Sequence, residues 1–297
     1  MPHDADTHPY VLPGGKASVT SRRKQLRAST RGAWLFGPAY LRTLLAARYG
    51  SRRQMHTATR SWARHATRAL ELTIETHGTH RIEPDQQYVV APLHEGFADV
   101  LALSRLPLDM AYSAAEELFA WRFLGPYLRA SGQSPVSIDN GVGSYRRMLR
   151  SARAAFGRNE SYVVFPQGSI LGIEVAFHEG AFTLAAQTGR PLLPVVLTGG
   201  ASVWDHPYSS QLNFGQKIRL EVLDPIDSTE VIHCAREIEI EMKERALAAT
   251  PTPRRFDPDR DGWWDGYRYE IDPAFPDLAR RVADHRGLLL TSESEAF

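Results

Sequence analysis

The chain divides near residue 72 into a helical region and a region where strands and helices alternate. Residues 33–49 and 54–71 carry apolar positions at helical spacing. Along 54–71, residues four apart form an arginine row and an apolar row, roughly 200° apart at about 100° per residue: Arg60, Arg64 and Arg68, and Trp62, Ala66 and Leu70. We therefore predict two helices, the second lying between an apolar layer and an anionic surface.

From residue 72 onward, short apolar runs alternate with stretches of helical periodicity. The runs predict strands at Leu72–Thr76, Tyr88–Ala91, Met110–Ser113, Ser161–Phe165, Leu192–Leu197 and Ile218–Leu223. The helical patterns lie at Asp99–Leu106, Glu117–Ala130, Ser144–Phe156, Ala181–Thr188 and Thr229–Ala248. Strands separated by helices predict an α/β fold, with a mostly parallel central sheet flanked by helices and a basic helical N-terminal extension.

Composition along the chain predicts four regions. Residues 1–20 are polar with several prolines and glycines and predict a disordered tail, residues 21–71 predict a basic amphipathic membrane-contact region, and residues 72–250 predict the core. Pro251–Pro258 marks a break before an extension, 251–297, that combines acidic residues with aromatic ones: Trp263, Trp264, Tyr267 and Tyr269. Dense aromatic residues argue against disorder, so we expect this extension to pack on the core.

The net charge of +1 conceals a strong asymmetry. Residues 1–70 hold 13 Lys+Arg and 2 Asp+Glu, a net of +11, so the rest of the chain carries a net of −10. A basic arm on an acidic body indicates an anionic partner, and a solvated, partly disordered N-terminus is the alternative. We expect an anionic membrane surface and no nucleic acid, because the arm lacks a recognisable nucleic-acid docking motif.

The apolar stretches are too short to cross a bilayer. The longest, Ala33–Ala47, contains Pro38 and Arg42 and falls below the roughly 18 apolar residues that a spanning helix needs. One cysteine, Cys234, excludes an intramolecular disulfide and most cysteine-rich metal sites. We expect a cytoplasmic protein that is peripheral to the membrane.

A histidine and an aspartate stand five residues apart where a buried run gives way to a helical pattern: Pro92-Leu93-His94-Glu95-Gly96-Phe97-Ala98-Asp99. In one continuous helix, residues at this spacing lie about 140° apart. The two side chains converge only if His94 lies on the turn and Asp99 lies in the first helical turn. Asp99 would then orient His94 as a general base toward an alcohol, although the spacing alone is a weak signal.

Three further blocks follow this pair in order. Gly132–Asn140 contains Ile138-Asp139-Asn140, Phe165–Ile170 reads Phe-Pro-Gln-Gly-Ser-Ile, and Gly189–Val196 is an apolar run with two prolines. Together with the His-x4-Asp block, these segments resemble the glycerolipid acyltransferase family, which includes the lysophosphatidic acid acyltransferases. The resemblance runs from about Thr73 to Leu247, well over half of the chain.

The resemblance implies an enzyme of phospholipid biosynthesis with His94 as general base and Asp99 orienting it. It would move a fatty acyl group from a donor thioester, acyl-CoA or acyl-carrier protein, to the hydroxyl of a lipid acceptor, with no metal and no other cofactor. The implied substrate-binding residues are Phe165, Pro166, Gln167, Gly168, Ser169, Asp139, Arg146 and Arg147. Backbone amides near Gly168 and Ser169 are candidates for stabilising the tetrahedral oxyanion.

The charges that the family usually places around an acceptor phosphate are missing. Ile170, Asn140 and Ala115 stand where Arg, Arg and Lys are usual, and Gln167 replaces Glu. Either other cations substitute or the acceptor lacks that phosphate; the candidate cations are Arg146, Arg147, Arg150 and Lys217. The open alternatives are lysophosphatidic acid acylation with a rebuilt phosphate site, acylation of a glycosylated lipid or carotenoid, and a non-catalytic lipid-binding relative.

Overall fold

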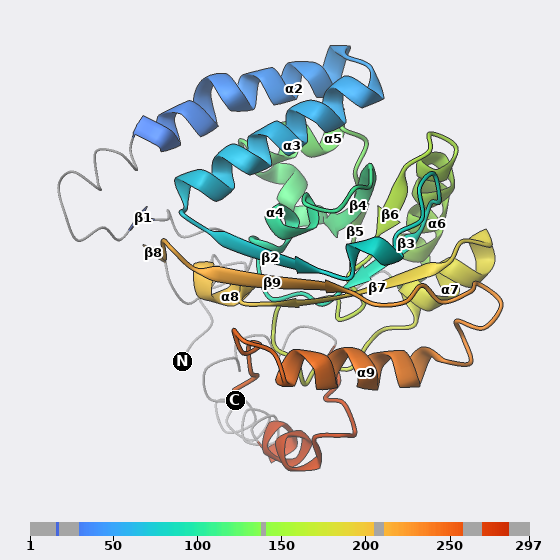
Figure 1. Ribbon diagram of the computed structural model, residues 1–297. Coiled ribbons are helices and arrows are strands. Elements are labelled where there is room, and N and C mark those ends of the chain that lie inside the picture. Colours follow the sequence, from blue (N-terminus) through green and yellow to red (C-terminus); the bar gives the residue numbers. More distant parts are fainter. Residues whose placement is uncertain (1–15, 18–29, 138–140, 205–210, 258–268, 285–297) are drawn as a thin grey trace, which may run out of the picture.

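A seven-stranded sheet organises the fold (Figure 1). The computed structural model describes residues 16–17, 30–137, 141–204, 211–257 and 269–284. Across the sheet the order is β2 (Thr73–His77), β9 (Lys217–Val222), β7 (Leu192–Thr198), β3 (Val89–Pro92), β6 (Ser161–Val163), β4 (Met110–Ala115) and β5 (Ser134–Val136). Neighbouring strands are parallel except for the β7–β9 pair. The predicted α/β class with a mostly parallel sheet is therefore confirmed.

Helices cover both faces of this sheet. In Figure 1, α2 (Tyr40–Tyr49) and α3 (Arg52–Ala69) form a hairpin above α4 (Asp99–Leu103), while α9 (Ala235–Leu247) lies under the opposite face. The remaining helices are α5 (Leu124–Ala130), α6 (Gly141–Phe156), α7 (Gly180–Thr188) and α8 (Gly200–Val203). Shorter turns are η1 (Leu35–Ala39), η2 (Thr79–Arg81) and η3 (Glu116–Ala120), and β1 (Lys16–Ala17) pairs with β8 (Gln211–Leu212) apart from the main sheet.

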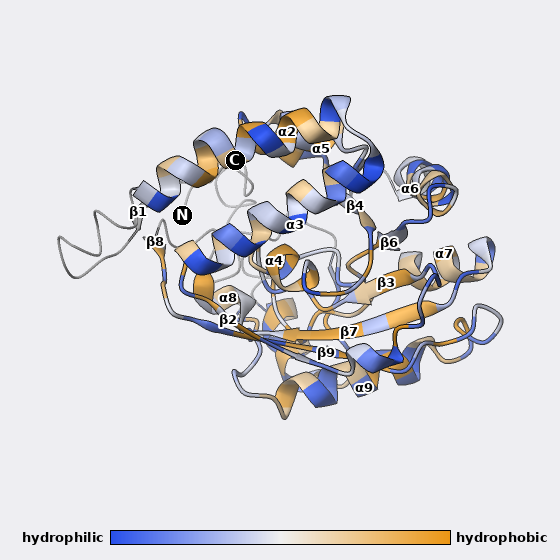
Figure 2. Ribbon diagram, turned by 45° about the horizontal axis from the view of Figure 1, so that its top comes forward, coloured by the Kyte–Doolittle hydropathy of each residue, from blue (hydrophilic) through white to orange (hydrophobic). Residues whose placement is uncertain are grey.

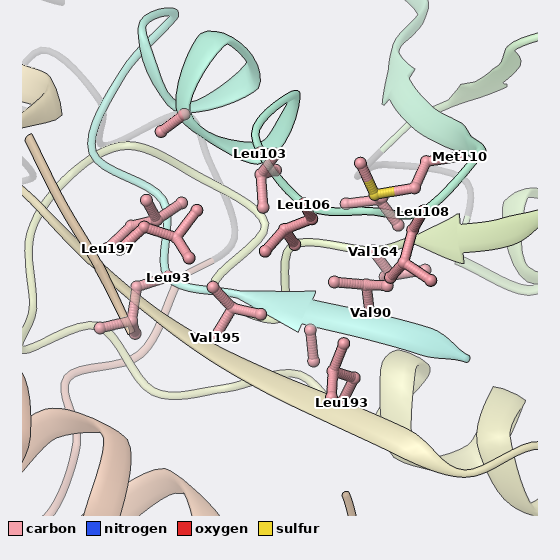
Figure 3. Packing of buried hydrophobic residues seen from close by; sticks show 14 of the residues in the cluster. Val90, Leu93, Leu103, Leu106, Leu108, Met110, Val164, Leu193, Val195 and Leu197 are labelled. Carbon is pink, nitrogen blue, oxygen red and sulfur yellow. The ribbon is translucent and has the colours of Figure 1, made fainter. Parts of the chain in front are cut away.

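The central strands are buried on both faces. Every residue of β3 and β7 is buried, which is why their sequences are continuous apolar runs rather than alternating ones. Figure 2 shows the same contrast in colour, with apolar central strands below a mostly hydrophilic α3. Val90 of β3 and Val195 of β7 pack in one cluster with Leu103 and Leu106, which close the core from the α4 side (Figure 3).

Several predicted boundaries were wrong, each for a local reason. The predicted helix 117–130 is broken into η3 and α5, because Pro126 lacks the N–H that a continuous helix needs and fits only a first turn. The predicted helix 229–248 begins only at Ala235. Strand β5 was missed because it contains Pro135 and lies at the sheet edge, where proline is tolerated.

The described part of the C-terminal extension contacts the core through a second apolar cluster. Phe256, Tyr269 and Val282 pack with Ile170 and Val175 from the loop after β6. Trp263, Trp264 and Tyr267 lie outside the described residues. The cluster places the C-terminal extension next to the segment that carries the third sequence block.

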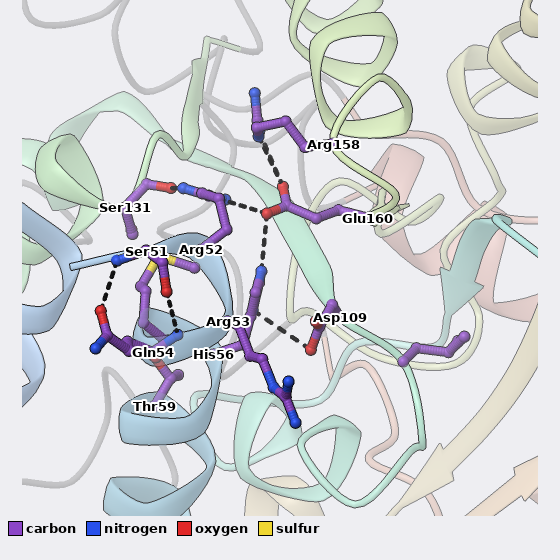
Figure 4. A network of polar contacts seen from close by, with 12 residues as sticks. Ser51, Arg52, Arg53, Gln54, His56, Thr59, Asp109, Ser131, Arg158 and Glu160 are labelled. Atoms are coloured by element: carbon purple, nitrogen blue, oxygen red, sulfur yellow. Dashed lines mark hydrogen bonds and ion pairs between the residues drawn. The ribbon is translucent and has the colours of Figure 1, made fainter. Parts of the chain in front are cut away.

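A buried ionic network fastens α3 to the sheet (Figure 4). Glu160, 1% exposed, accepts from Arg52 Nε at 2.5 Å, His56 Nε2 at 2.8 Å and Arg158 Nη2 at 2.9 Å. Burial works against ionisation of Glu160, but these three hydrogen bonds outweigh it and lower its pKa to about 2. The carboxylate therefore joins α3 to the turn before β6.

Arg60 also belongs to this anchor rather than to a lipid-facing row. Its guanidinium lies 2.6 Å from Asp109 Oδ1 and donates to the Leu108 carbonyl at 2.8 Å. Arg64 and Arg68 are exposed, whereas Ala66 is buried and Trp62 donates to the Leu35 carbonyl. The predicted helix is confirmed at α3, but one of its three arginines holds the core.

The Glu160 network predicts a large and pH-dependent contribution to stability. Glu160→Gln removes the buried anion that the partly exposed Arg52 and Arg158 share, and it should lower the free energy of unfolding at pH 7 by about 1–3 kcal/mol. Because the folded-state pKa lies below the ordinary value of 4.5, the contribution is present above that value and is lost as the pH falls toward about 2. Urea titrations at pH 7 and pH 3 measure both effects.

Glu71→Gln is the matched control. Its partner Arg31 lies 3.7 Å away, and both side chains are about half exposed, so the change should stay under about 1 kcal/mol. Equal destabilisation by the two substitutions would contradict the anchoring role of Glu160.

Candidate active site

His94 and Asp99 meet at the carboxyl end of β3. The strand ends at Pro92, a turn carries His94, and Asp99 opens α4. His94 Nδ1 lies 2.8 Å from Asp99 Oδ2, and the Asp99 side chain is fully buried. The structure therefore brings the two residues together in the arrangement that their spacing required.

Asp99 is held by the turn that it helps to form. Its Oδ2 accepts from the backbone N–H groups of Glu95 at 2.7 Å and Gly96 at 3.0 Å. Both donors lie just before α4. Asp99 itself stands in the first turn of α4, where the helix dipole favours a carboxylate. The carboxylate thus has a fixed position before any substrate binds.

On its other side, the Asp99 carboxylate lies against Gly200, where there is no room for a larger residue. A Cβ atom on Gly200 would overlap Asp99 Oδ1. Oδ1 has no hydrogen-bond partner among the described residues. Gly200, which follows β7, is thus a close neighbour of Asp99 that the sequence patterns did not single out.

The outer nitrogen of His94 is available for chemistry. The ring stacks on Phe165 with centroids 3.9 Å apart, and the side chain is 23% exposed. With Nδ1 hydrogen-bonded to Asp99, the proton of a neutral imidazole lies on Nδ1 and the lone pair lies on Nε2. Nε2 can therefore accept a proton from an approaching group.

Gln167 positions the histidine turn. Its Oε1 accepts from His94 N at 2.7 Å and its Nε2 donates to the Gly172 carbonyl at 2.8 Å. The residue is 2% exposed, so its side chain is engaged in protein contacts rather than directed to a ligand. An ionised carboxylate could not make the second bond, which gives a physical reason for an amide here.

The rest of the third block lies beside the histidine in different environments. Gly168 has φ of +65°, and a Cβ there would come within 2.9 Å of the His178 ring. Pro166 and Ser169 are buried, and Ser169 Oγ has no hydrogen-bond partner among the described residues. Ile170 is 6% exposed and packs in the C-terminal apolar cluster, so an apolar side chain rather than a cation occupies this position.

The remaining sequence-predicted residues lie on or before α6. Asp139 lies outside the described residues. Arg146 is exposed, and half-buried Arg147 donates from Nη2 to Ser144 Oγ at 3.1 Å, while its Nε has no partner in the described part of the chain. Because β3, β6, β4 and β5 are parallel, α6 begins at the same end of the sheet as the turn with His94, the end where these strands have their carboxyl termini.

Glu95 and an aromatic cluster are site features that the sequence reasoning missed. Phe97 of the turn lies 5.5 Å from Trp121 and 5.2 Å from Trp204 between ring centroids. Glu95 is buried, and burial followed by the nearby charge of Asp99 raises its pKa to about 8. Its position directly after His94 was the one sequence signal available. No group of three or more potential metal ligands is assembled within the described ranges.

Comparison with known proteins identifies relatives of this chain. A family model described as Acyltransferase matches residues 73–198. A 1-acyl-sn-glycerol-3-phosphate acyltransferase of Bacillus subtilis (strain 168) is 26% identical over 180 residues, which cover 60% of this chain and 82% of that enzyme. The alpha form from Mus musculus is 26% identical over 137 residues, which cover 45% of this chain and 48% of that protein, so the chain spans about half of this longer relative.

One solved structure shares the fold. The 1-acyl-sn-glycerophosphate (LPA) acyltransferase PlsC from Thermotoga maritima aligns with a TM-score of 0.59 at 18% identity. The alignment covers 75% of this chain and 96% of that one. The fold likeness therefore extends beyond the region that the family model matches.

The contact between Gly200 and Asp99 predicts a sensitive position outside the four blocks. Gly200→Ala should displace the Asp99 carboxylate and lower kcat/KM for acyl transfer by at least about 100-fold, because the histidine tautomer is no longer enforced. Gly157→Ala is the control, since its Cβ would lie 3.5 Å from the nearest atom, an ordinary contact. A Gly200→Ala enzyme with wild-type kcat/KM would show that Asp99 tolerates displacement.

Proposed function

Because the chain belongs to the glycerolipid acyltransferase family, we propose that it moves a fatty acyl group from an acyl-CoA or acyl-carrier-protein thioester to the hydroxyl of a lipid acceptor. The observation that carries this proposal is the buried Asp99 carboxylate bonded to Nδ1 of a partly exposed His94. A histidine oriented in this way is a general base with an open outer nitrogen.

The proposed reaction needs no protein nucleophile. His94 Nε2 takes the proton of the acceptor hydroxyl as its oxygen attacks the thioester carbonyl carbon. The tetrahedral intermediate then collapses, the C–S bond breaks, and the leaving sulfur takes the proton from the imidazolium. Asp99 stabilises that imidazolium, and backbone amides near Gly168 and Ser169 are proposed to bind the oxyanion.

Two acceptor classes fit different features of the site. The names of the relatives favour a phosphate-bearing lysolipid, whose phosphate we assign to the cations at the start of α6, Arg146 and Arg147. A lipid alcohol with a neutral headgroup is the second candidate. The packing of Ile170 in an apolar cluster favours it, since no cation occupies that position.

The chemistry is tested by removing the base and its partner. His94→Ala should lower kcat/KM by about 10²–10⁴-fold, because a positioned general base is lost. Asp99→Asn should also lower it strongly, because the amide no longer holds the reactive tautomer. Release of the donor thiol in the presence of acceptor, together with lipid chromatography, measures the transfer.

His80→Ala is the control, an exposed histidine that should leave turnover unchanged. The assay is run with lysophosphatidic acid and with monoacylglycerol at equal concentrations, which separates the two acceptor candidates. Wild-type turnover by purified, folded His94→Ala protein would refute the proposed mechanism.

We also propose that the enzyme docks on an anionic membrane through its N-terminal helices. Within the described ranges, no helix is long and apolar enough to span a bilayer. The N-terminal helices and the start of α5 instead expose large apolar side chains that are 47% to 75% accessible, here called the aromatic surface: Trp34, Phe36, Leu41, Leu45, Tyr49 and Phe123. Exposed arginines stand among them: Arg31, Arg42, Arg48, Arg53 and Arg122.

Aromatic contacts connect this surface with the histidine turn. Phe36 and Tyr40 contact the Phe123 ring at 6.2 and 6.1 Å between centroids. Two residues before Phe123, Trp121 contacts Phe97 of the histidine turn. A lipid held at the aromatic surface would therefore lie beside the turn that carries the proposed base.

If the protein docks on a membrane through the aromatic surface, removing apolar side chains should weaken vesicle binding on that face and not on the opposite face. The double variant Leu41→Glu, Leu45→Glu should weaken binding to vesicles of phosphatidylglycerol and phosphatidylcholine by about tenfold or more, since it removes insertion and adds repulsion. Sedimentation of vesicles with bound protein measures the effect.

The control variant is Ile240→Glu, Leu247→Glu, which changes two exposed apolar residues of α9 under the opposite face of the sheet. It should bind like wild type. Equal weakening by both double variants would place the membrane contact elsewhere.

A further inference from the structure

One face of α6 carries a row of exposed arginines. Arg146, Arg150 and Arg153 are all exposed, and they are here called the arginine row. At about 100° per residue, the three side chains start within about 60° of one another around the helix axis. The helix contains no Asp or Glu. The row is therefore a strip of positive charge that follows α6 for about two helical turns.

The opposite face of α6 fixes the direction of the row. Met148, Ala152 and Ala155 are buried, and they lie on the other side of the helix axis. A Cβ atom on Gly180, the first residue of α7, would lie 3.6 Å from Met148 Cε, an ordinary contact. The apolar face thus packs on the core and on α7, and the arginine row faces solvent.

The folded chain does not use the charges of the row. Within the part of the chain that the structure describes, none of the three guanidinium groups makes an ion pair. Arg158, just beyond the helix, is different, because its Nη2 lies 2.9 Å from Glu160 Oε2. Like charges about one turn apart on a helix repel and weaken it slightly. Internal stabilisation therefore does not explain the row.

The row lies on the side of the sheet away from the N-terminal helices. The connection from β3 to β4 through α4 crosses the sheet in one direction, and the connection from β5 to β6 through α6 crosses it in the other. Because such crossovers are right-handed, α4 and α6 lie on opposite faces. The hairpin of α2 and α3 lies on the α4 side (Figure 1). A membrane bound through α2, as proposed above, leaves the row open to a soluble partner.

The row is also close to the active site, but it does not line it. Helix α6 begins at the end of the sheet that carries the His94 turn. At 1.5 Å per residue, Arg150 and Arg153 lie about 14 and 18 Å along the helix from Gly141. A partner bound there would lie beside the site and would need a long arm to bring a thioester to His94.

The shape of the row favours a protein partner over a small molecule. Small ligands bind in concave sites, whereas these guanidinium groups stand along the convex outer face of a helix. A partner helix with carboxylates three and four residues apart presents the matching charges on one face. Complementary charges of this kind steer association and select the partner.

We propose that the arginine row docks an acidic helix of the carrier protein that bears the acyl thioester. This inference rests on the proposed acyl transfer by His94. Arg150 and Arg153 bind the partner, while its acylated arm reaches around the start of α6 to the histidine. The surface therefore recognises an acyl-carrier protein and not free acyl-CoA.

The test compares two donors with one acceptor. The full chain, with lysophosphatidic acid in micelles of an uncharged detergent, is given palmitoyl-acyl-carrier protein or palmitoyl-CoA. The double variant Arg150→Glu, Arg153→Glu should raise KM for the carrier-protein donor at least about tenfold and leave KM for palmitoyl-CoA within about twofold. Arg146 is left unchanged, because the acceptor phosphate is assigned to it. Arg150→Gln, Arg153→Gln removes the charges without reversing them and should give a smaller change of the same kind.

The control is Arg64→Glu, Arg68→Glu, which makes the same charge change at two exposed arginines of α3. At about 0.15 M salt, charges act over about 8 Å, so a general effect of net charge is screened. The control should leave KM unchanged for both donors.

A binding measurement is independent of turnover. Fluorescence anisotropy of labelled palmitoyl-acyl-carrier protein, without acceptor, should show an affinity that falls as salt is added. The Arg150→Glu, Arg153→Glu variant should bind at least about tenfold more weakly than wild type, and the α3 control should bind like wild type.

The outcomes separate this inference from the proposed function. An equal rise in KM for both donors, unchanged KM for both, equal weakening by the α3 control, or a wild-type protein that neither binds nor uses the carrier-protein donor would each overturn the docking proposal. The proposed function would survive these results as long as palmitoyl-CoA is used. If neither donor supports transfer by any form of the protein, the proposed function fails, while the anisotropy measurement still tests the docking.

Discussion

The buried carboxylate of Asp99 is the constraint on which the active site depends. One oxygen accepts hydrogen bonds from His94 Nδ1 and two backbone amides, and the other lies against Gly200. A fully buried anion is costly unless it is hydrogen-bonded, so the turn before α4 and the glycine after β7 must both keep their geometry. The position of His94 thus follows from the hydrogen bonds that stabilise one buried carboxylate.

The sheet and the segment 251–257 supply the rest of that geometry. Parallel strands bring the turn with His94, the loop after β6 and the start of α6 to one edge, although they are far apart in sequence. Gln167 and Glu95 then join the histidine turn to that loop and to the segment 251–257. At the amino ends of these strands, Glu160 fixes α3 before β6, so the N-terminal helices are held to the same framework as His94 and Asp99.

The sequence predicted what is local or periodic. Apolar runs located six of the seven strands of the main sheet, and the spacing of His94 and Asp99 required a turn followed by a helix start, as the structure has it. Features that depend on distant segments escaped prediction. Gly200 and Arg254 contact the histidine turn across more than 100 residues, and the apolar neighbours of Ile170 include residues of the C-terminal extension. Such contacts leave no periodic signal in one sequence.

The central claim is that His94 activates a lipid hydroxyl for direct attack on a thioester. The most direct measurement follows an isotopically labelled acyl-CoA with a lysolipid acceptor by mass spectrometry of both the lipids and the intact protein. The account predicts one labelled ester on the acceptor for each thiol released, and no acyl adduct on the protein. Thiol release without ester formation, or a labelled acyl-enzyme that forms before the product, would contradict it.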